Sequence, residues 1–270
     1  MRLPFQQLFD NPQLFVRDLL LFIPGFVIAL VLHELAHAYV ALRCGDPTAK
    51  MMGRVTLNPL KHLDPLGTFM LVFAGIGWAK PVPVNPRNFK KPRRDDILVS
   101  IAGIGTNLAL FLLFTAIMYA FLFIALSRSG LEIYLGEKVI MIDTRSYFPA
   151  SLAFAFPFAT EIAEAVISLQ LGVAMSLLYQ IIAKAALINF TLALFNLLPM
   201  PPLDGSHLFS NLFFNRQDLF ASPSAARAGQ VVVLLLLFTG WFSQAMNFLL
   251  TGTFGFFGRA AATISQAMGL

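Results

Sequence analysis

The chain has 270 residues, of which 57% are hydrophobic and only 12% are charged, and its mean hydropathy is +0.74. A soluble domain carries about 25% charged residues, so this composition excludes an ordinary soluble protein and indicates an integral membrane protein. The sequence pI of about 9.6 does not indicate nucleic acid as a partner, because the basic residues gather at the ends of apolar stretches, as in membrane proteins. The single cysteine, Cys44, excludes an intrachain disulfide.

Four apolar stretches are long enough to cross a bilayer, which takes about 20 apolar residues in a helix. They cover residues 19–42, 97–126, 170–198 and 231–250. We therefore expect an all-α integral membrane protein with about four main transmembrane helices, some interfacial helices, and a single membrane-embedded domain over residues 1–270.

The segment that follows the first stretch is too short and too interrupted to span the bilayer. Its apolar part, residues 66–78, contains three glycines, and it continues into the proline-rich run Lys80–Pro86. Three prolines within six residues exclude a helix there, because proline lacks the backbone N–H that a helix needs. The pattern predicts a re-entrant segment with a short β-like insert.

The distribution of Lys and Arg predicts the orientation in the membrane. Ten of the nineteen lie in the loop 43–96, whereas the loop 127–146 holds three. Cytoplasmic loops carry the excess of Lys and Arg, so the loop 43–96 is predicted to be cytoplasmic. The C-terminal ends of the first and third stretches then face the same, cytoplasmic side.

The first stretch ends in an H-E-x-x-H pattern formed by His33, Glu34 and His37. Residues four apart lie on one face of a helix, where two imidazoles can bind one Zn²⁺. Glu34 can take a proton from the attacking water and pass it to the leaving amine. The alternative, polar residues of an ordinary solvated helix, is disfavoured because each ionisable residue at the bilayer centre costs about 2.5–3.5 kcal/mol.

A catalytic zinc site needs three protein ligands and one open position. Asp204 is the best candidate for the third ligand, because it follows three prolines that break the third stretch on the predicted cytoplasmic side. The alternative role for Asp204 is the N-cap of a helix that begins near Ser206. His207 competes as a ligand, whereas His62 in the basic loop is expected to be a solvated residue without a ligand role.

Together these patterns resemble the site-2 protease family of intramembrane zinc metalloproteases. Residues 33–37 resemble the family's H-E-x-x-H helix, and residues 196–205 resemble its N-x-x-P-x-x-x-L-D-G motif. Residues 103–107 resemble its G-x-x-x-N motif, and residues 77–86 are similar to a segment of the compact prokaryotic members, which lack PDZ and CBS domains.

The resemblance implies one Zn²⁺ per chain, with Asp204 as the third ligand beside His33 and His37, and it implies that Asn107 faces the active site. Two positions depart from the family pattern without changing a ligand, and these are Ile104 and Ser206.

Two features have roles that the sequence leaves open. Asn107 can donate a hydrogen bond to the oxyanion or the substrate backbone, or it can form an ordinary interhelical hydrogen bond. The segment 77–86 can pair as an extended edge with an unwound substrate strand. On that hypothesis, proline at Val82 and Val84 blocks cleavage while zinc stays bound.

The sequence thus predicts a zinc metalloendopeptidase in which Glu34 and Asn107 are catalytic. Its expected partners are the lipid bilayer and a transmembrane protein substrate, cut in or near its span, or a remnant signal peptide. The expected location is the cell membrane, with the active site toward the cytoplasm. The alternatives are a membrane metal transporter or metal-binding protein, which has no need of Glu34 between the ligands and usually shows matched half-repeats, and a non-catalytic scaffold.

Overall fold

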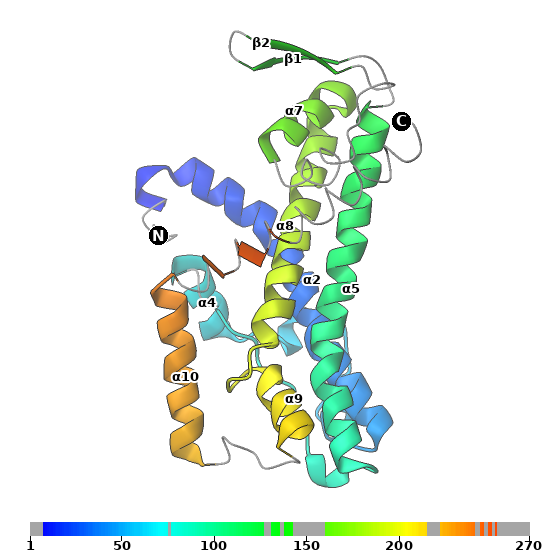
Figure 1. The fold of residues 1–270 in the computed structure, drawn as a ribbon, viewed down its shortest axis with the longest axis vertical. Coiled ribbons are helices and arrows are strands. Elements are labelled where there is room, and N and C mark those ends of the chain that lie inside the picture. Colours follow the sequence, from blue (N-terminus) through cyan, green and yellow to red (C-terminus); the bar gives the residue numbers. More distant parts are fainter. Residues whose placement is uncertain are drawn as a thin grey trace. The chain divides into compact units, whose positions relative to one another are not determined.

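Long helices carry most of the chain in the computed structural model, which describes residues 8–74, 77–126, 131–135, 138–142, 160–214, 222–240, 244–245, 248–249 and 252. Within these residues, three helices are long and apolar enough to cross a membrane (Figure 1), and these are α2 (Pro12–Cys44), α5 (Pro92–Leu126) and α8 (Val173–Asn196). The prediction of an all-α membrane protein is confirmed.

The helices begin earlier than the apolar stretches because polar residues cap them. Helix α2 begins at Pro12, where the side chain of Asn11 accepts a hydrogen bond from the Leu14 N–H at 3.1 Å. It ends at Cys44, since Gly45 has a φ of 109°, a left-handed conformation that closes the helix.

The fourth predicted span does not form a spanning helix within the described residues. Helix α10 (Pro223–Phe238) begins ahead of position 231 because Ser222 caps it, accepting from the Ala225 N–H at 3.1 Å. Its 16 residues are fewer than the roughly 20 that a span requires. Part of the predicted span, including residues 241–243, lies outside the described residues.

The chain folds into two compact units. The first comprises residues 1–111 and 187–241, and the second comprises residues 112–186 and 242–270. The second contains α7 (Thr160–Leu171) and an antiparallel hairpin of β1 (Leu131–Leu135) and β2 (Lys138–Ile142). The sequence predicted no hairpin in that loop. All the candidate site residues belong to the first unit.

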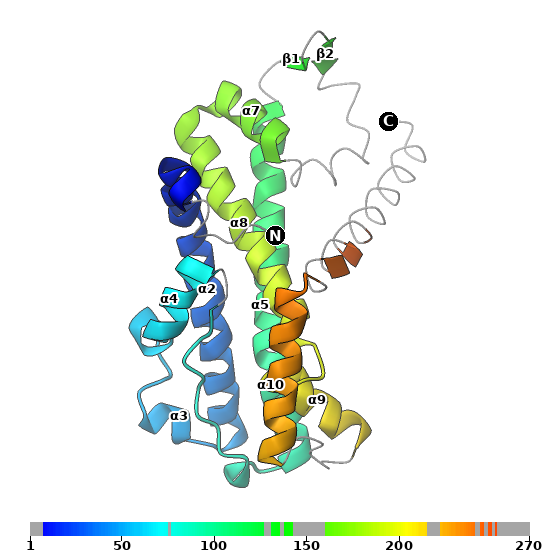
Figure 2. The same cartoon turned by 90° about the vertical axis from the view of Figure 1, so that its left-hand side faces the viewer.

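The predicted re-entrant segment contains a helix followed by an extended chain. After α3 (Thr48–Met51) and the 3₁₀ turn η1 (Pro59–Lys61), α4 (Pro65–Ala74) forms a ten-residue helix. The extended chain that follows (Figure 2) runs to the 3₁₀ turn η2 (Pro86–Asn88). In the described residues its β character is limited to one bridge between Leu63 and Ala79. Proline limits this pairing, because it has no N–H to donate.

A buried carboxylate fixes this extended chain to the end of α2. Asp46 is fully buried and accepts hydrogen bonds from the Asn85 N–H at 2.7 Å and the Asn88 side chain at 2.8 Å. It also accepts from the backbone and hydroxyl of Thr48. Burial acts to raise the pKa of Asp46, but these hydrogen bonds outweigh it and lower the pKa below its ordinary value.

Asparagine at position 46 is expected to destabilise the protein by about 1–3 kcal/mol. Its NH₂ group would face N–H and O–H donors whose hydrogen bonds the carboxylate now accepts. The melting temperature in detergent should fall by about 2–10 °C. Since the folded-state pKa lies below the unfolded one, the contribution of Asp46 is complete above about pH 4 and is lost as pH falls through the folded value. The difference in melting temperature between Asp46→Asn and wild type should therefore be largest near neutral pH.

The matched control is Asp64→Asn. The Asp64 side chain accepts a hydrogen bond from the Gly67 N–H at 2.7 Å, at a helix start where asparagine and aspartate are equivalent. Equal melting temperatures for wild type and Asp46→Asn at neutral pH would contradict a clamping role for Asp46.

Candidate active site and metal centre

The two histidines of the H-E-x-x-H pattern lie side by side on α2. Both are buried, their Nε2 atoms are 3.0 Å apart, and the two rings meet edge to face. This arrangement follows from their spacing of four residues, which places both side chains on one face of the helix.

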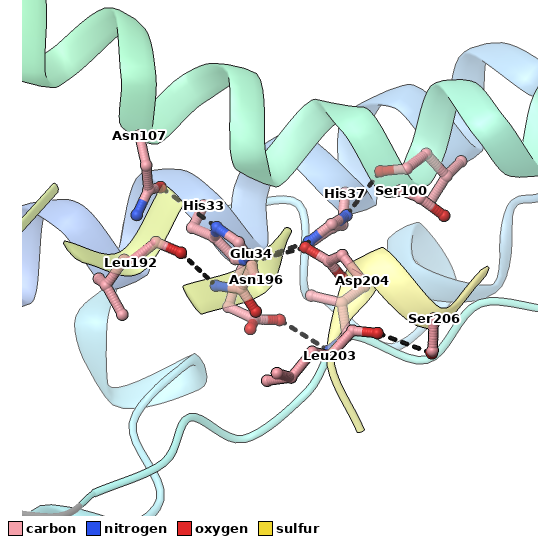
Figure 3. A network of polar contacts seen from close by, with 12 residues as sticks. His33, Glu34, His37, Ser100, Asn107, Leu192, Asn196, Leu203, Asp204 and Ser206 are labelled. Carbon is pink, nitrogen blue, oxygen red and sulfur yellow. Dashed lines mark hydrogen bonds and ion pairs between the residues drawn. The ribbon is translucent and has the colours of Figure 1, made fainter. Parts of the chain in front are cut away.

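Asp204 faces the two histidines from the start of α9 (Asp204–Phe213). Its Oδ2 atom lies 3.3 Å from His33 Nε2 and 3.2 Å from His37 Nε2 (Figure 3). Asp204 is the first residue of the helix and Leu203 is the N-cap, so the N-cap role considered for Asp204 is wrong. A carboxylate in the first turn is still favoured by the partial positive charge of the helix N-terminus.

Gly205 permits this position of Asp204 through close packing. A Cβ at residue 205 would lie 2.3 Å from the carbonyl oxygen of Leu198 and 2.4 Å from that of Leu197. Glycine is required here because α9 approaches the end of α8 so closely that any side chain would prevent the contact.

The outer nitrogens of both imidazoles bind oxygen acceptors. His33 Nδ1 lies 3.1 Å from Asn107 Oδ1, and His37 Nδ1 lies 2.8 Å from the carbonyl oxygen of Val99. An oxygen acceptor requires a proton on Nδ1, so in the neutral imidazoles both Nε2 atoms carry lone pairs. Partners of this kind orient metal-binding histidines.

The three atoms that converge are therefore all acceptors, and they fit a metal cation. Asp204 Oδ2 is buried with no hydrogen-bond donor among the described residues, and it meets two nitrogen lone pairs within 3.3 Å. Tetrahedral ligands at about 2.0–2.1 Å from zinc lie about 3.3–3.4 Å apart, close to the separations here. Two imidazoles and a carboxylate leave one position open, as catalytic zinc requires.

The charge of Asp204 suits the same ion. Burial acts to raise its pKa, whereas protons placed on the facing Nε2 atoms of His33 and His37 would outweigh burial and lower the pKa. A cation in the place of those protons favours the anionic carboxylate in the same way.

Helix α5 touches both histidines at Gly103. A Cβ at that position would lie 2.4 Å from His37 Nε2 and 2.5 Å from His33 Cε1. The absence of a side chain at Gly103 therefore keeps the space between α5 and the imidazoles open.

Glu34 points to the extended chain. Its Oε2 atom accepts a hydrogen bond from the backbone N–H of Val82 at 2.9 Å, and its side chain is buried. Figure 3 shows Glu34 next to His33 on α2. The segment that the sequence assigned to substrate thus contacts the predicted general base.

The far end of α9 is attached to the start of α5. Arg93 Nε donates to the carbonyl oxygen of Asn211 at 2.9 Å, and the Asn211 side chain donates to Asp96. A second nitrogen of Arg93 lies 3.4 Å from the carbonyl oxygen of Leu212. A ten-residue helix held at its C-terminal end leaves Asp204, at the other end, little freedom to move.

The other polar residues that the sequence offered lie outside the group of converging ligand atoms. His207 is exposed, and it is outside the group that converges. His62 is fully buried, with Nε2 2.8 Å from the carbonyl oxygen of Thr56, so the expectation that it is solvated is wrong. Asn196 donates to the Leu192 carbonyl of its own helix.

The contact of Asn107 with His33 matches one of the two roles that the sequence left open, the interhelical hydrogen bond, and it also places Asn107 beside the site. It is an interhelical hydrogen bond, but its partner is a candidate ligand, and the Asn107 Nδ2 atom is buried without a partner in the described residues. A catalytic role for Asn107 stays a prediction. Sequence reasoning missed Val99, and it assigned Val82 to substrate pairing without foreseeing its contact with Glu34. Both residues contribute backbone atoms, which no residue-type pattern reveals.

Comparisons with known proteins give a family and several relatives of the chain. The model of a family described as peptidase family M50 matches residues 21–240. The chain is 39% identical over 212 residues to "Putative zinc metalloprotease YwhC" of Bacillus subtilis (strain 168), covering 78% of this chain and 77% of that protein. No solved structure matches the chain.

Shorter matches name the same activity. The chain is 36% identical over 116 residues to "Putative zinc metalloprotease Rip2" of Mycolicibacterium smegmatis, covering 41% of this chain and 44% of that protein. It is 40% identical over 100 residues to the protein of the same name in Mycobacterium tuberculosis, covering 35% and 38%.

Proposed function

The chain belongs to peptidase family M50 and is a membrane zinc metalloprotease, and from this premise we propose that it cuts transmembrane segments of other membrane proteins, or remnant signal peptides. The observation that supports the proposal is the position of the ligands. His33 and His37 lie on α2, a helix long and apolar enough to span a membrane. A peptide bond that reaches them is most directly supplied by another span in the same bilayer.

Each residue of the site has a separate role in the proposed reaction. His33, His37 and Asp204 would hold the ion, and Asn107 and the Val99 carbonyl orient the imidazoles. Zinc, when bound, supplies a Lewis acid that activates water and polarises the scissile carbonyl. Glu34 takes the proton from the attacking water and gives it to the leaving amine, as a general base and then a general acid.

Hydrolysis requires the substrate to lose its helical form, because a helix buries each peptide carbonyl in an i to i−4 hydrogen bond. The extended chain 77–86 is a candidate for holding the unwound strand. Within it, the Val82 and Asn85 N–H groups are bound to Glu34 and Asp46. Of the two valines in the pairing hypothesis, Val84 keeps an N–H that has no protein partner among the described residues. We therefore narrow the hypothesis from Val82 and Val84 to Val84.

The proposed location is the cell membrane, with the site toward the cytoplasm. The support is the concentration of Lys and Arg in the loop 43–96, which includes the extended chain beside Glu34.

The proposal is tested with purified protein in lipid vesicles and two forms of one substrate. One form places the scissile sequence in a single transmembrane span, and the other is a water-soluble peptide of the same sequence. We expect zinc-loaded protein to cut the span and to lose activity on chelation, because the Lewis acid is removed. Readdition of zinc should restore cleavage.

The control protein carries Glu34→Gln, so that cleavage by a contaminant is detected. Preference for the soluble peptide would contradict the proposed substrate class. Zinc flux across the vesicles, with no cleavage of a panel of spans, would support the transporter alternative instead.

A further inference from the structure

The backbone N–H of Val82 is the only hydrogen-bond donor to Glu34 in the described part of the chain. Its distance of 2.9 Å to Oε2 is that of a well-formed bond. The other carboxylate oxygen, Oε1, receives no hydrogen bond from the described residues. We propose that the Val82 amide is a positioning group, which holds Glu34 by Oε2 and leaves Oε1 to accept the proton.

The sequence around Val82 keeps this amide in place. Pro81 and Pro83 flank it, and each fixes its own φ near −65° and restricts the residue before it to an extended conformation. A chain of this kind has few alternative conformations, so its one N–H stays directed at Glu34. The prolines themselves have no N–H that could compete for the carboxylate.

Both ends of the extended chain are anchored. On one side the Lys80 N–H donates to the His62 carbonyl at 2.8 Å, and Arg54 donates to the Lys80 carbonyl. On the other side Asp46 accepts from Asn85. The side chain of Arg54 and the backbone carbonyl of His62 thus fix the strand that holds the general base.

The side chain at position 84 links the same strand to the helices of the site. Val84 packs against a buried cluster of Ala41 and Cys44 from α2, Phe89, and Val99 from α5. Val99 also supplies the carbonyl that orients His37. The strand that positions Glu34 and the helix that positions His37 therefore share one packed cluster.

The positioning role rests on the proposed function, and two measurements test it separately. The first measures hydrogen exchange and needs no activity. Residues 81–84 contain only two amides, those of Val82 and Val84. In Glu34→Ala the Val82 amide should exchange about 10- to 100-fold faster than in wild type, the effect of losing a hydrogen bond to a charged group. The Val84 amide should be unchanged.

The second measurement is the kinetics of Val82→Pro, which removes the N–H. We expect kcat to fall about 100-fold, because a displaced catalytic group loses most of its effect. KM and the content of one zinc per chain should stay near wild type. Val82→Ala, which keeps the N–H, should restore the kcat that proline removes.

Val84→Pro is compared with Val82→Pro, because the strand-pairing hypothesis assigns the Val84 amide to substrate binding. It should raise KM by about 2- to 10-fold, the effect of one neutral hydrogen bond. If Val82→Pro does not fold, a backbone ester at Val82 removes the same N–H and keeps the side chain.

Each result supports or overturns the positioning role. Equal Val82 exchange in wild type and Glu34→Ala overturns it, and so does a wild-type kcat in folded, zinc-loaded Val82→Pro or in the ester. If wild type cuts no transmembrane substrate, the proposed function fails, while the exchange experiment still decides whether Val82 holds Glu34.

Discussion

Glutamine in place of Glu34 is expected to reduce cleavage by about 10²- to 10⁴-fold, the contribution of a general base. The amide oxygen of glutamine can still accept from the Val82 N–H, so the side chain should keep its position. It cannot take a proton from water at neutral pH. The measurement is single-turnover cleavage of a transmembrane substrate, with the zinc content determined in the same sample.

The zinc content of Glu34→Gln should stay at about one per chain, because His33, His37 and Asp204 are unchanged. Asp204→Ala is the matched variant, for which we expect zinc to be lost. It removes a candidate ligand, so its loss of zinc affinity should exceed the 10- to 100-fold that outer-shell changes cause. If Glu34→Gln loses zinc, or if Asp204→Ala keeps it, the division of roles between these two acids is wrong.

Alanine in place of Gly103 is expected to weaken zinc binding and to reduce cleavage. Its Cβ would lie 2.4 Å from His37 Nε2 and 2.5 Å from His33 Cε1, far inside van der Waals contact. The imidazoles or α5 must shift, and overpacking of this kind costs about 1–3 kcal/mol. The zinc dissociation constant should rise by about 5- to 150-fold for that energy. It is measured by competition with a chelator of known affinity.

Gly105→Ala is the control for this variant, because it lies two residues further along the same helix. A Cβ there meets only Ile101 Cγ2, at 4.0 Å. Both substitutions change the intrinsic helix preference equally. We expect Gly105→Ala to bind zinc and to cut like wild type. Equal zinc affinity for the two variants would contradict a specific role for Gly103.

Helix α5 organises the site without supplying a candidate ligand. Asn107 and Val99 fix the two imidazoles by their Nδ1 atoms, and Gly103 lets the helix approach them. The start of the same helix holds the far end of α9 through Arg93. A displacement of α5 would therefore change both parts of the ligand set, which makes this helix a natural target for mutations that alter zinc affinity indirectly.

The sequence by itself determined those features of the fold and of the site that depend on local periodicity and residue type. The apolar stretches predicted the three long helices, because length and hydropathy decide whether a segment can span a bilayer. The spacing of His33 and His37 predicted their shared face on α2. The three prolines before Asp204 predicted the break that brings this acid to a new helix.

The boundaries and the β structure were harder to predict, for physical reasons. Caps at Asn11 and Ser222 extend helices beyond the apolar residues, so hydropathy alone places their starts too late. The proline-rich chain has one β bridge, at Ala79, since proline cannot donate to a ladder. Strand pairing instead occurs in β1 and β2.

Only the tertiary structure decided which atoms face each other in the site. The acceptors on the Nδ1 atoms of His33 and His37 come from α5, some 60 to 75 residues further along the chain. The donor to Glu34 is the backbone of Val82, and a backbone N–H is present in every residue except proline. Residue types can therefore indicate the ligands and the base, but the groups that orient them depend on how separate segments pack together.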